Sequence, residues 1–124
     1  MTESTEAQRV VLRGVMDRWK AAVDAHQPEE VAACFAEDAI FQGLRPYSVG
    51  RPGIAQYYES QPFGLVADYA VLEFRALAQD VLLGYLKVDF SFVERPTIVV
   101  TLGVVLRCSE GEWFISHYQV THLD

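Results

Sequence analysis

The histidines and cysteines, the side chains of this 124-residue chain best suited to metal or nucleophilic chemistry, are few and widely spaced. His117 and His122 stand five residues apart on an expected strand, so alternation sends them to opposite faces and they form no two-ligand metal site. Cys34 and Cys108 also lack ligand spacing; buried reduced thiols are the favoured interpretation, and a disulfide stays open. Because no phosphate loop, nucleophile elbow or metal motif is present, we expect no metal and no cofactor.

Composition narrows the class of protein and its partners. Apolar residues make up 51% of the chain and charged residues 22%, as in ordinary globular domains. The net charge of -7 and the scattered positions of the ten basic residues disfavour nucleic acid as a partner. No apolar run approaches the roughly 20 residues that cross a bilayer, and the polar, acidic start MTESTEAQRV resembles neither a signal nor a transit peptide. We therefore expect one cytoplasmic domain over residues 1–124, with no membrane partner.

The first half of the chain has the spacing of helices. Apolar residues recur every three or four positions from about Thr5 to His26, which predicts an amphipathic helix. Pro28 suits the first position of a second, short helix. A brief strand is expected at Ala39–Phe41, a loop at Gly43–Gly50, and a third helix from Pro52 to about Ser60.

After Gly64 the apolar residues alternate, as they do in strands. Four strands are predicted, at Tyr69–Ala78, Val81–Phe92, Thr97–Cys108 and Glu112–Leu123. The connections between them are too short for parallel crossovers, so neighbouring strands must be antiparallel. Helices followed by an antiparallel meander predict an α+β fold, with three N-terminal helices packed on a curved, mostly antiparallel sheet.

Alternation also assigns the strand side chains to two faces of the sheet, if each hairpin is centred on its turn. The face expected against the helices holds Leu72, Phe74, Leu82, Leu86, Val88, Phe90, Ile98, Val100, Leu102, Val104, Leu106, Phe114, Ser116, Tyr118 and Val120.

The opposite face combines Tyr85, Trp113 and Ile115 with polar groups that include His117 and Gln119. Aromatic residues in polar surroundings are typical of association surfaces, so we expect a homodimer packed sheet to sheet through this outer face. A solvated face is the alternative. A register shift of one residue would exchange the faces, and with them the pairs Ser116/Tyr118 and His117/Gln119.

Four segments together resemble a known superfamily. Residues 15–23 read VMDRWKAAV, residues 31–39 VAACFAEDA and residues 50–58 GRPGIAQYY. In this order they resemble the helical half of SnoaL-like and ketosteroid-isomerase-like proteins, and residues 111–118, GEWFISHY, resemble the last strand of the same nuclear-transport-factor-2-like superfamily. The nearest group is the small SnoaL-like proteins of enediyne and other polyketide pathways. The resemblance implies a cone of helices and curved sheet that encloses one largely apolar pocket.

The resemblance also points to three positions at which enzymes of the superfamily carry carboxylates. The general base of the isomerases matches Gly43, and their oxyanion-hole acid matches Val104, or Gly103 under a different loop alignment. The essential aspartate of polyketide cyclases and limonene-epoxide hydrolases matches Tyr118. None of these residues is acidic, so the usual acid–base chemistry is expected to be absent or rebuilt.

What the resemblance leaves in the pocket is aromatic. Trp19 matches the oxyanion-hole tyrosine of the isomerases and Tyr58 a supporting tyrosine, while Tyr118 projects from the last strand. Their N–H and O–H groups could donate to a carbonyl or hydroxyl as their rings pack on an apolar ligand; simple core packing is the alternative. Arg45 and Arg51 could hold an anionic group at the mouth or be solvated. The expected ligand-binding residues are Trp19, Phe41, Tyr47, Tyr58, Val104, Ser116 and Tyr118.

Three functions stay open. The first, which we expect, is the binding of a small hydrophobic molecule, such as a polycyclic or polyketide-like compound. The second is a cyclase, isomerase or oxygenase-like enzyme that acts on an aromatic or ketone intermediate, with Tyr118 or Tyr58 as proton donor. Because a phenol with a pKa of about 10 is a poor base at neutral pH, this function requires a perturbed tyrosine or His122 in the pocket. The third is a domain that serves assembly alone. A tightly filled pocket favours the third, and a cavity of about 300 Å³ or more favours the first two.

Overall fold

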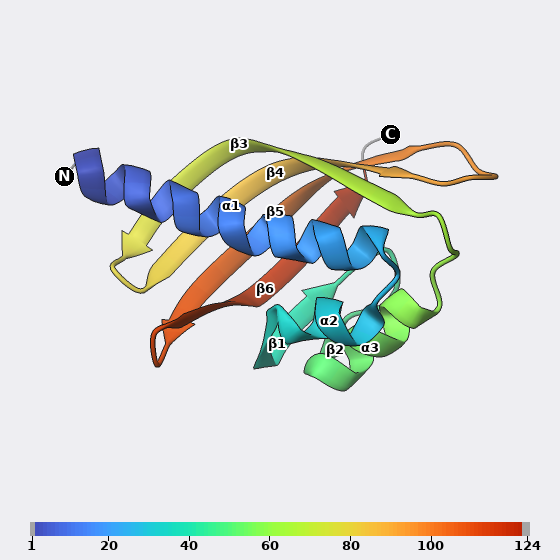
Figure 1. The fold of residues 1–124 in the computed structure, drawn as a ribbon, viewed down its shortest axis with the longest axis horizontal. Coiled ribbons are helices and arrows are strands. Elements are labelled where there is room, and N and C mark those ends of the chain that lie inside the picture. Colours follow the sequence, from blue (N-terminus) through green and yellow to red (C-terminus); the bar gives the residue numbers. More distant parts are fainter. Residues whose placement is uncertain (1, 123–124) are drawn as a thin grey trace.

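Three helices and six strands make up the described part of the chain, residues 2–122 of a computed structural model, with side chains described for residues 5–122. α1 lies along the concave face of the sheet, and α2 and α3 pack at one end of it (Figure 1). The α+β class is therefore confirmed, and the predicted strand end at Leu123 lies outside the described residues. The elements are α1 (Thr2–Asp24), α2 (Pro28–Ala33), β1 (Phe35–Gln42), β2 (Ser48–Val49), α3 (Arg51–Glu59), β3 (Val66–Ala78), β4 (Val81–Ser91), β5 (Ile98–Ser109) and β6 (Glu112–His122).

The strands form one curved sheet in the order β2-β1-β6-β5-β4-β3. Every neighbouring pair is antiparallel except β1 and β6, which run parallel and set Phe35 beside Ile115 and Phe41 beside Tyr118. β1 is longer than the predicted strand Ala39–Phe41, because it begins directly after α2. It thereby brings the first strand of the chain into contact with the last.

The apolar stripe of α1 holds this helix in the hollow of the sheet. Leu12, Val15, Met16, Trp19 and Val23 recur at three- and four-residue spacing, and all are buried. Leu12 also closes on β4, where a Cβ added at Gly84 would meet its side chain at 3.1 Å. Helix and sheet therefore fit closely, without a gap between them at this point.

The C-terminal end of α1 is fastened to the edge strand β3 by polar contacts. The backbone N–H of Ala67 donates to Asp24 Oδ1 over 2.9 Å, and Lys20 Nζ donates to the Ala67 carbonyl over 2.8 Å. Lys20 also pairs with Asp24 and Asp68. The first residues of β3, which lack a neighbouring strand on that side, thus have their backbone groups bonded to the helix.

Two β-bulges overturn part of the predicted assignment of faces. An extra residue in β3, Leu72, interrupts the register between Val71 and Glu73, and its side chain is 47% exposed. An extra residue in β6, Ser116, does the same between Ile115 and His117. A bulge reverses the alternation beyond it.

The predicted faces of Leu72 and Phe114 are therefore wrong, and so is the outer placement of Trp113 and Ile115. Ile115 is fully buried, Trp113 packs against the core, and Phe114 lies in an outside groove. Away from the bulges the prediction holds, since Leu82, Leu86, Val88, Val100 and Leu102 are all fully buried.

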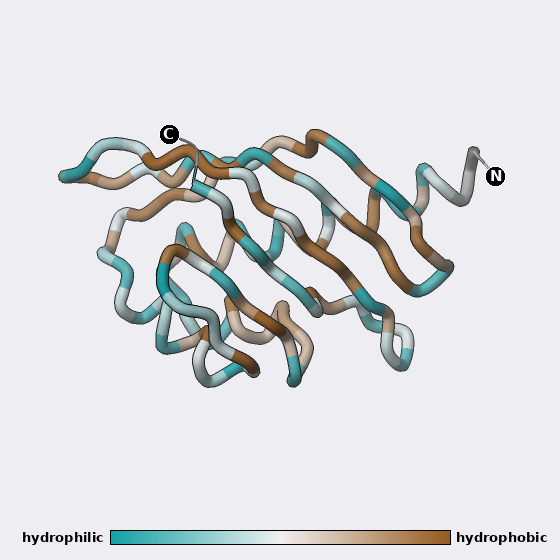
Figure 2. The backbone as a smooth tube through the Cα atoms, turned by 180° about the vertical axis from the view of Figure 1, so that it is seen from behind, coloured by the Kyte–Doolittle hydropathy of each residue, from teal (hydrophilic) through white to brown (hydrophobic). Residues whose placement is uncertain are grey.

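Hydropathy along the backbone follows this arrangement. Figure 2 shows apolar stretches along the strands, interrupted by polar residues. Of the helices described, none combines the length and the apolar character that a bilayer crossing requires.

Candidate functional site

Three buried polar side chains meet inside the cone and form a hydrogen-bonded chain. Trp19 on α1 donates its Nε1–H to the hydroxyl of Tyr58 on α3, over 3.2 Å. The Tyr58 hydroxyl lies 3.2 Å from that of Tyr118 on β6. The residues are 0%, 4% and 1% exposed, respectively. The structure thus brings together the three residues that the family resemblance placed in one pocket.

The hydrogen-bonded side chains Trp19, Tyr58 and Tyr118 have one donor for which they supply no acceptor. The indole N–H only donates, whereas each phenol has one proton and can also accept. Between the two hydroxyls there is a single contact, which uses one phenolic proton. No acceptor for the other proton is found among the described residues. The pair Tyr58–Tyr118 therefore presents one O–H group to whatever lies beside it.

Burial decides the protonation state of both phenols. It raises the pKa of Tyr58 above its usual value, against the smaller opposing effect of the hydrogen bond with Tyr118. Burial likewise raises the pKa of Tyr118 well above that value, and the neighbouring Tyr58 raises it further. Both groups are neutral at physiological pH, so neither acts as a general base there. Their available chemistry is hydrogen-bond donation.

Aromatic rings fill the space around the phenol pair. The Tyr118 ring stacks on Phe41, with centroids 4.6 Å apart and planes at 22°. Phe35 and Trp19 contact the same ring at 5.7 and 6.0 Å. These contacts make Phe41 and Trp19 the walls that hold Tyr118 in place.

The cavity that remains beside the phenols is small. It measures about 30 Å³, enough for about one water molecule, and lies at the mouth of the cone. Ligand pockets begin near 300 Å³, so the interior is tightly filled. The phenols Tyr58 and Tyr118 belong to its lining, which is otherwise mostly apolar: Leu44, Tyr57, Tyr58, Gln61, Leu65, Phe90, Phe92, Ile98, Tyr118 and Val120.

The ring of Tyr57 fills the space beside Gly43, the residue that the resemblance matched with the isomerase base. A Cβ built on Gly43 would lie 2.7 Å from the Cζ and hydroxyl oxygen of Tyr57, well inside contact distance. Val104 is 1% exposed in the core, where its side chain lies against Gly84. A carboxylate at either position would have to displace packed atoms.

Three predicted site residues, Tyr47, Ser116 and Arg51, lie away from the cavity. Tyr47 is 65% exposed in the loop after β1, and Ser116 is the extra residue of the β6 bulge. Arg51 donates to the Phe35 carbonyl over 2.8 Å and lies over Phe114, so it faces a different groove. Sequence reasoning missed Phe90 and Ile98 as lining residues. Their place on the inner face was the available signal.

The histidines and cysteines form no metal centre. His117 lies on the outer face and contacts Gln119 over 3.2 Å. Cys34 and Cys108 are free thiols, and only Cys34 is fully buried. Within residues 5–122, no three potential ligands gather to hold a metal ion.

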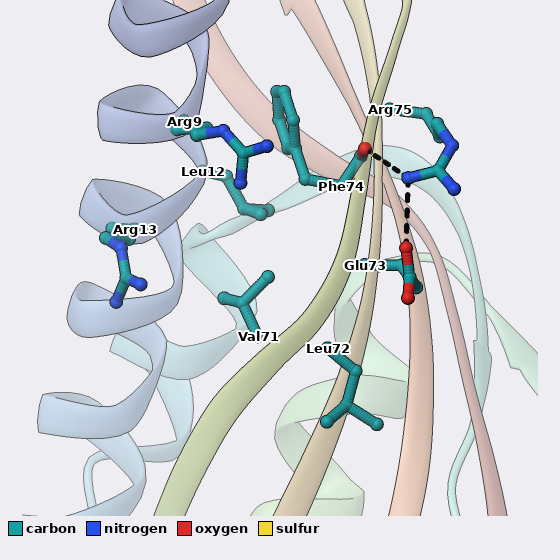
Figure 3. A pocket seen from close by; sticks show the side chains of 8 residues that line it. All are labelled: Arg9, Leu12, Arg13, Val71, Leu72, Glu73, Phe74 and Arg75. Atoms are coloured by element: carbon teal, nitrogen blue, oxygen red, sulfur yellow. Dashed lines mark hydrogen bonds and ion pairs between the residues drawn. The ribbon is translucent and has the colours of Figure 1, made fainter.

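A second hollow lies outside the cone, between α1 and β3 (Figure 3). Its volume is about 130 Å³, and none of its lining residues also lines the cone cavity. Arg9 lies over the Phe74 ring at 5.1 Å, while Arg75 turns to Glu73 and to the Phe74 carbonyl. Arg13 of α1 completes the cationic side of this groove.

Solved structures with the same fold are numerous. A ketosteroid isomerase-like protein from Erwinia carotovora atroseptica has a TM-score of 0.80 at 18% identity, covering 93% of this chain and 95% of that one. A candidate scytalone dehydratase from Novosphingobium aromaticivorans has 0.80 at 16%, covering 100% and 89%. A nuclear-transport-factor-2-like protein of unknown function from Pseudomonas putida has 0.80 at 18%, covering 94% and 87%. No curated protein matches the chain. A family model of the SnoaL-like domain matches residues 5–119, so the chain belongs to the SnoaL-like family.

Proposed function

We propose that the protein binds a small hydrophobic molecule that carries a hydrogen-bond acceptor, at the mouth of its cone. The observation behind this proposal is the surplus phenolic proton of Tyr58–Tyr118 beside an apolar cavity. A ligand oxygen in this cavity would accept the proton in place of water, and such a hydrogen bond contributes about 0.5–1.5 kcal/mol. Two structures of this fold bear the names of enzymes that act on small molecules, a ketosteroid isomerase-like protein and a candidate scytalone dehydratase, which is in keeping with such a site.

Binding of anything larger than water requires the mouth to open. Leu44 is the natural cover, because it comes from the loop between β1 and β2 and its side chain is already 47% exposed. Moving it outwards therefore gives up only part of its buried surface, whereas Tyr118 and Phe41 are fixed in the core. Leu44 would move and the phenol pair would stay.

A matched pair of compounds tests this proposal. 2-Acetylnaphthalene and 2-ethylnaphthalene share the naphthalene ring and a two-carbon side chain, and only the first has an acceptor oxygen. We expect the ketone to bind about five- to tenfold more tightly, the equivalent of one hydrogen bond. Phenylalanine at both Tyr58 and Tyr118 should abolish this preference, and Tyr47→Phe, at an exposed loop position, should leave it unchanged. The proposal would be refuted if neither thermal shift nor native mass spectrometry detects binding of any compound in a wider lipophilic panel.

A homodimer packed through the outer sheet face is the second part of this proposal. A shallow depression of about 390 Å³ crosses that face, with Leu83, Tyr85 and Val105 among its lining and Tyr85 42% exposed. Because Trp113 and Ile115 lie on the inner side, Leu83, Tyr85 and Val105 form the apolar centre of the outer face. Light scattering should report a dimer that Val105→Glu dissociates, whereas the matched change at exposed Val10 on α1 should not.

The filled cone favours one other function, a domain that serves assembly alone. The two experiments above separate the alternatives. If the protein is a dimer and binds no compound of the panel, assembly is the function. If it is a monomer and binds the ketone, the ligand-binding proposal stands and the dimer proposal fails.

A further inference from the structure

Two arginines each lie over an aromatic ring that lines the cone cavity. Arg45 Cζ is 5.9 Å from the centroid of Tyr57, and Arg95 Cζ is 4.9 Å from the centroid of Phe92. They come from distant parts of the chain, the loop after β1 and the β4–β5 connection. Because both rings belong to one cavity lining, each guanidinium group lies one ring away from the same cavity.

Among the five ion pairs of the described residues, none includes Arg45 or Arg95, whereas Arg9 and Arg75 each pair with a glutamate. Both arginines are exposed. A guanidinium held over a ring keeps its N–H edge available to anionic oxygens. In a chain of net charge -7, two unpaired cations beside an apolar opening form a local site for negative charge.

We propose that the ligand of the cone is an amphipathic anion, an organic acid whose largely apolar body, with its acceptor for the phenols, enters the mouth while its acidic group stays outside against Arg45 and Arg95. This inference rests on the proposed function and specifies its ligand class. The rim suits such a molecule, because Leu44 and Val93 add exposed apolar surface next to the two arginines. A neutral hydrocarbon would use the apolar surface alone.

Two fluorescent dyes with the same aromatic body test the inference. 1-Anilinonaphthalene-8-sulfonate carries an acidic group, and N-phenyl-1-naphthylamine lacks it. Arg45→Gln and Arg95→Gln should each weaken binding of the sulfonate about two- to fivefold, the range of exposed ion pairs, and the double variant about tenfold. Binding of the neutral dye should stay within about twofold. Added salt should weaken only the sulfonate.

Arginines elsewhere on the molecule provide matched controls. Arg13→Gln alters the groove between α1 and β3 (Figure 3), and Arg107→Gln alters the groove beside the β5–β6 turn. Neither should change the affinity for the sulfonate. An equal loss in these variants would overturn the inference, as would tight binding of the neutral dye with no effect of Arg45 or Arg95. In that second case the proposed function survives, whereas failure of both dyes and of the ligand panel overturns both proposals.

Discussion

Replacing Gly43 by alanine tests the packing that closes the cone. The new Cβ would lie 2.7 Å from two atoms of the Tyr57 side chain. That ring has little room to retreat, since it packs edge-on against Phe41 at 4.9 Å and Tyr58 at 5.1 Å. Overpacking of this kind costs about 1–3 kcal/mol. Alanine also restricts the unfolded chain, which returns about 0.4–1 kcal/mol.

The net result should be a loss of about 1–2 kcal/mol of unfolding free energy. Urea denaturation followed by tryptophan fluorescence would measure it as a lower midpoint at constant slope. Gly14→Ala is the matched control, because this exposed position in α1 has no atom within 4 Å of the added Cβ. It should stabilise the protein by about 0.5–1 kcal/mol through helix propensity.

A double-mutant cycle makes the test specific to the contact. Tyr57→Leu removes the ring atoms that Gly43→Ala would meet, so alanine at position 43 should cost much less when Tyr57→Leu is already present, by about 1 kcal/mol or more. Equal stabilisation by Gly43→Ala and Gly14→Ala would refute the reasoning. So would a cycle without coupling, since the ring of Tyr57 would then not occupy the space beside Gly43.

Three other outcomes are expected. Tyr58→Phe should lower the free energy of unfolding by about 2–3 kcal/mol, because it removes the hydrogen-bond partner of both the Trp19 N–H and the Tyr118 O–H. Tyr118→Phe should lower it by only about 1 kcal/mol. Equal urea midpoints of the two variants would contradict this order. Burial holds the pKa of the Tyr58 and Tyr118 phenols above the unfolded value of about 10, so the stability that they contribute is complete below about pH 10 and is lost as the pH rises above it. A urea midpoint that stays constant above about pH 10, or that falls equally in the Tyr58→Phe/Tyr118→Phe variant, would contradict this expectation. Asp24→Ala should speed amide exchange at Ala67 about tenfold, and hydrogen exchange with no change at Ala67 would exclude the bond.

Much of the fold could be predicted from the sequence because its signals are local. The spacing of Leu12, Val15 and Trp19 dictates a helix, and the turn residues between strands dictate hairpins. Where alternation runs uninterrupted, as in β4 and β5, the buried face was right. The β1–β6 pairing follows from no local signal, because nothing in residues 35–42 marks a parallel partner so distant in sequence.

The bulges at Leu72 and Ser116 show why the rest could not be predicted. A single extra residue reverses every face beyond it, and neither position carries a glycine or proline that would announce it. For the same reason Trp113 was assigned to the dimer face. Arg95 was missed at the mouth because its position depends on the stacking of one hairpin residue over Phe92, which only three-dimensional packing reveals.

The position of β6 between β1 and β5 also sets the order in which the strands of the sheet can pair during folding. β3, β4 and β5 are joined by hairpins and can pair as soon as they are synthesised, whereas β1 has only the two-residue β2 and the final strand β6 as described partners. The edge of β1 that pairs with β6, from Phe35 to Gln42, therefore gains its partner strand only after β6 has been synthesised, although Phe41 can already pair with Ser48 of β2. Such non-local pairing slows folding and prolongs the exposure of apolar side chains. The segment from β1 to α3 is where nascent chains of this protein would depend most on chaperones.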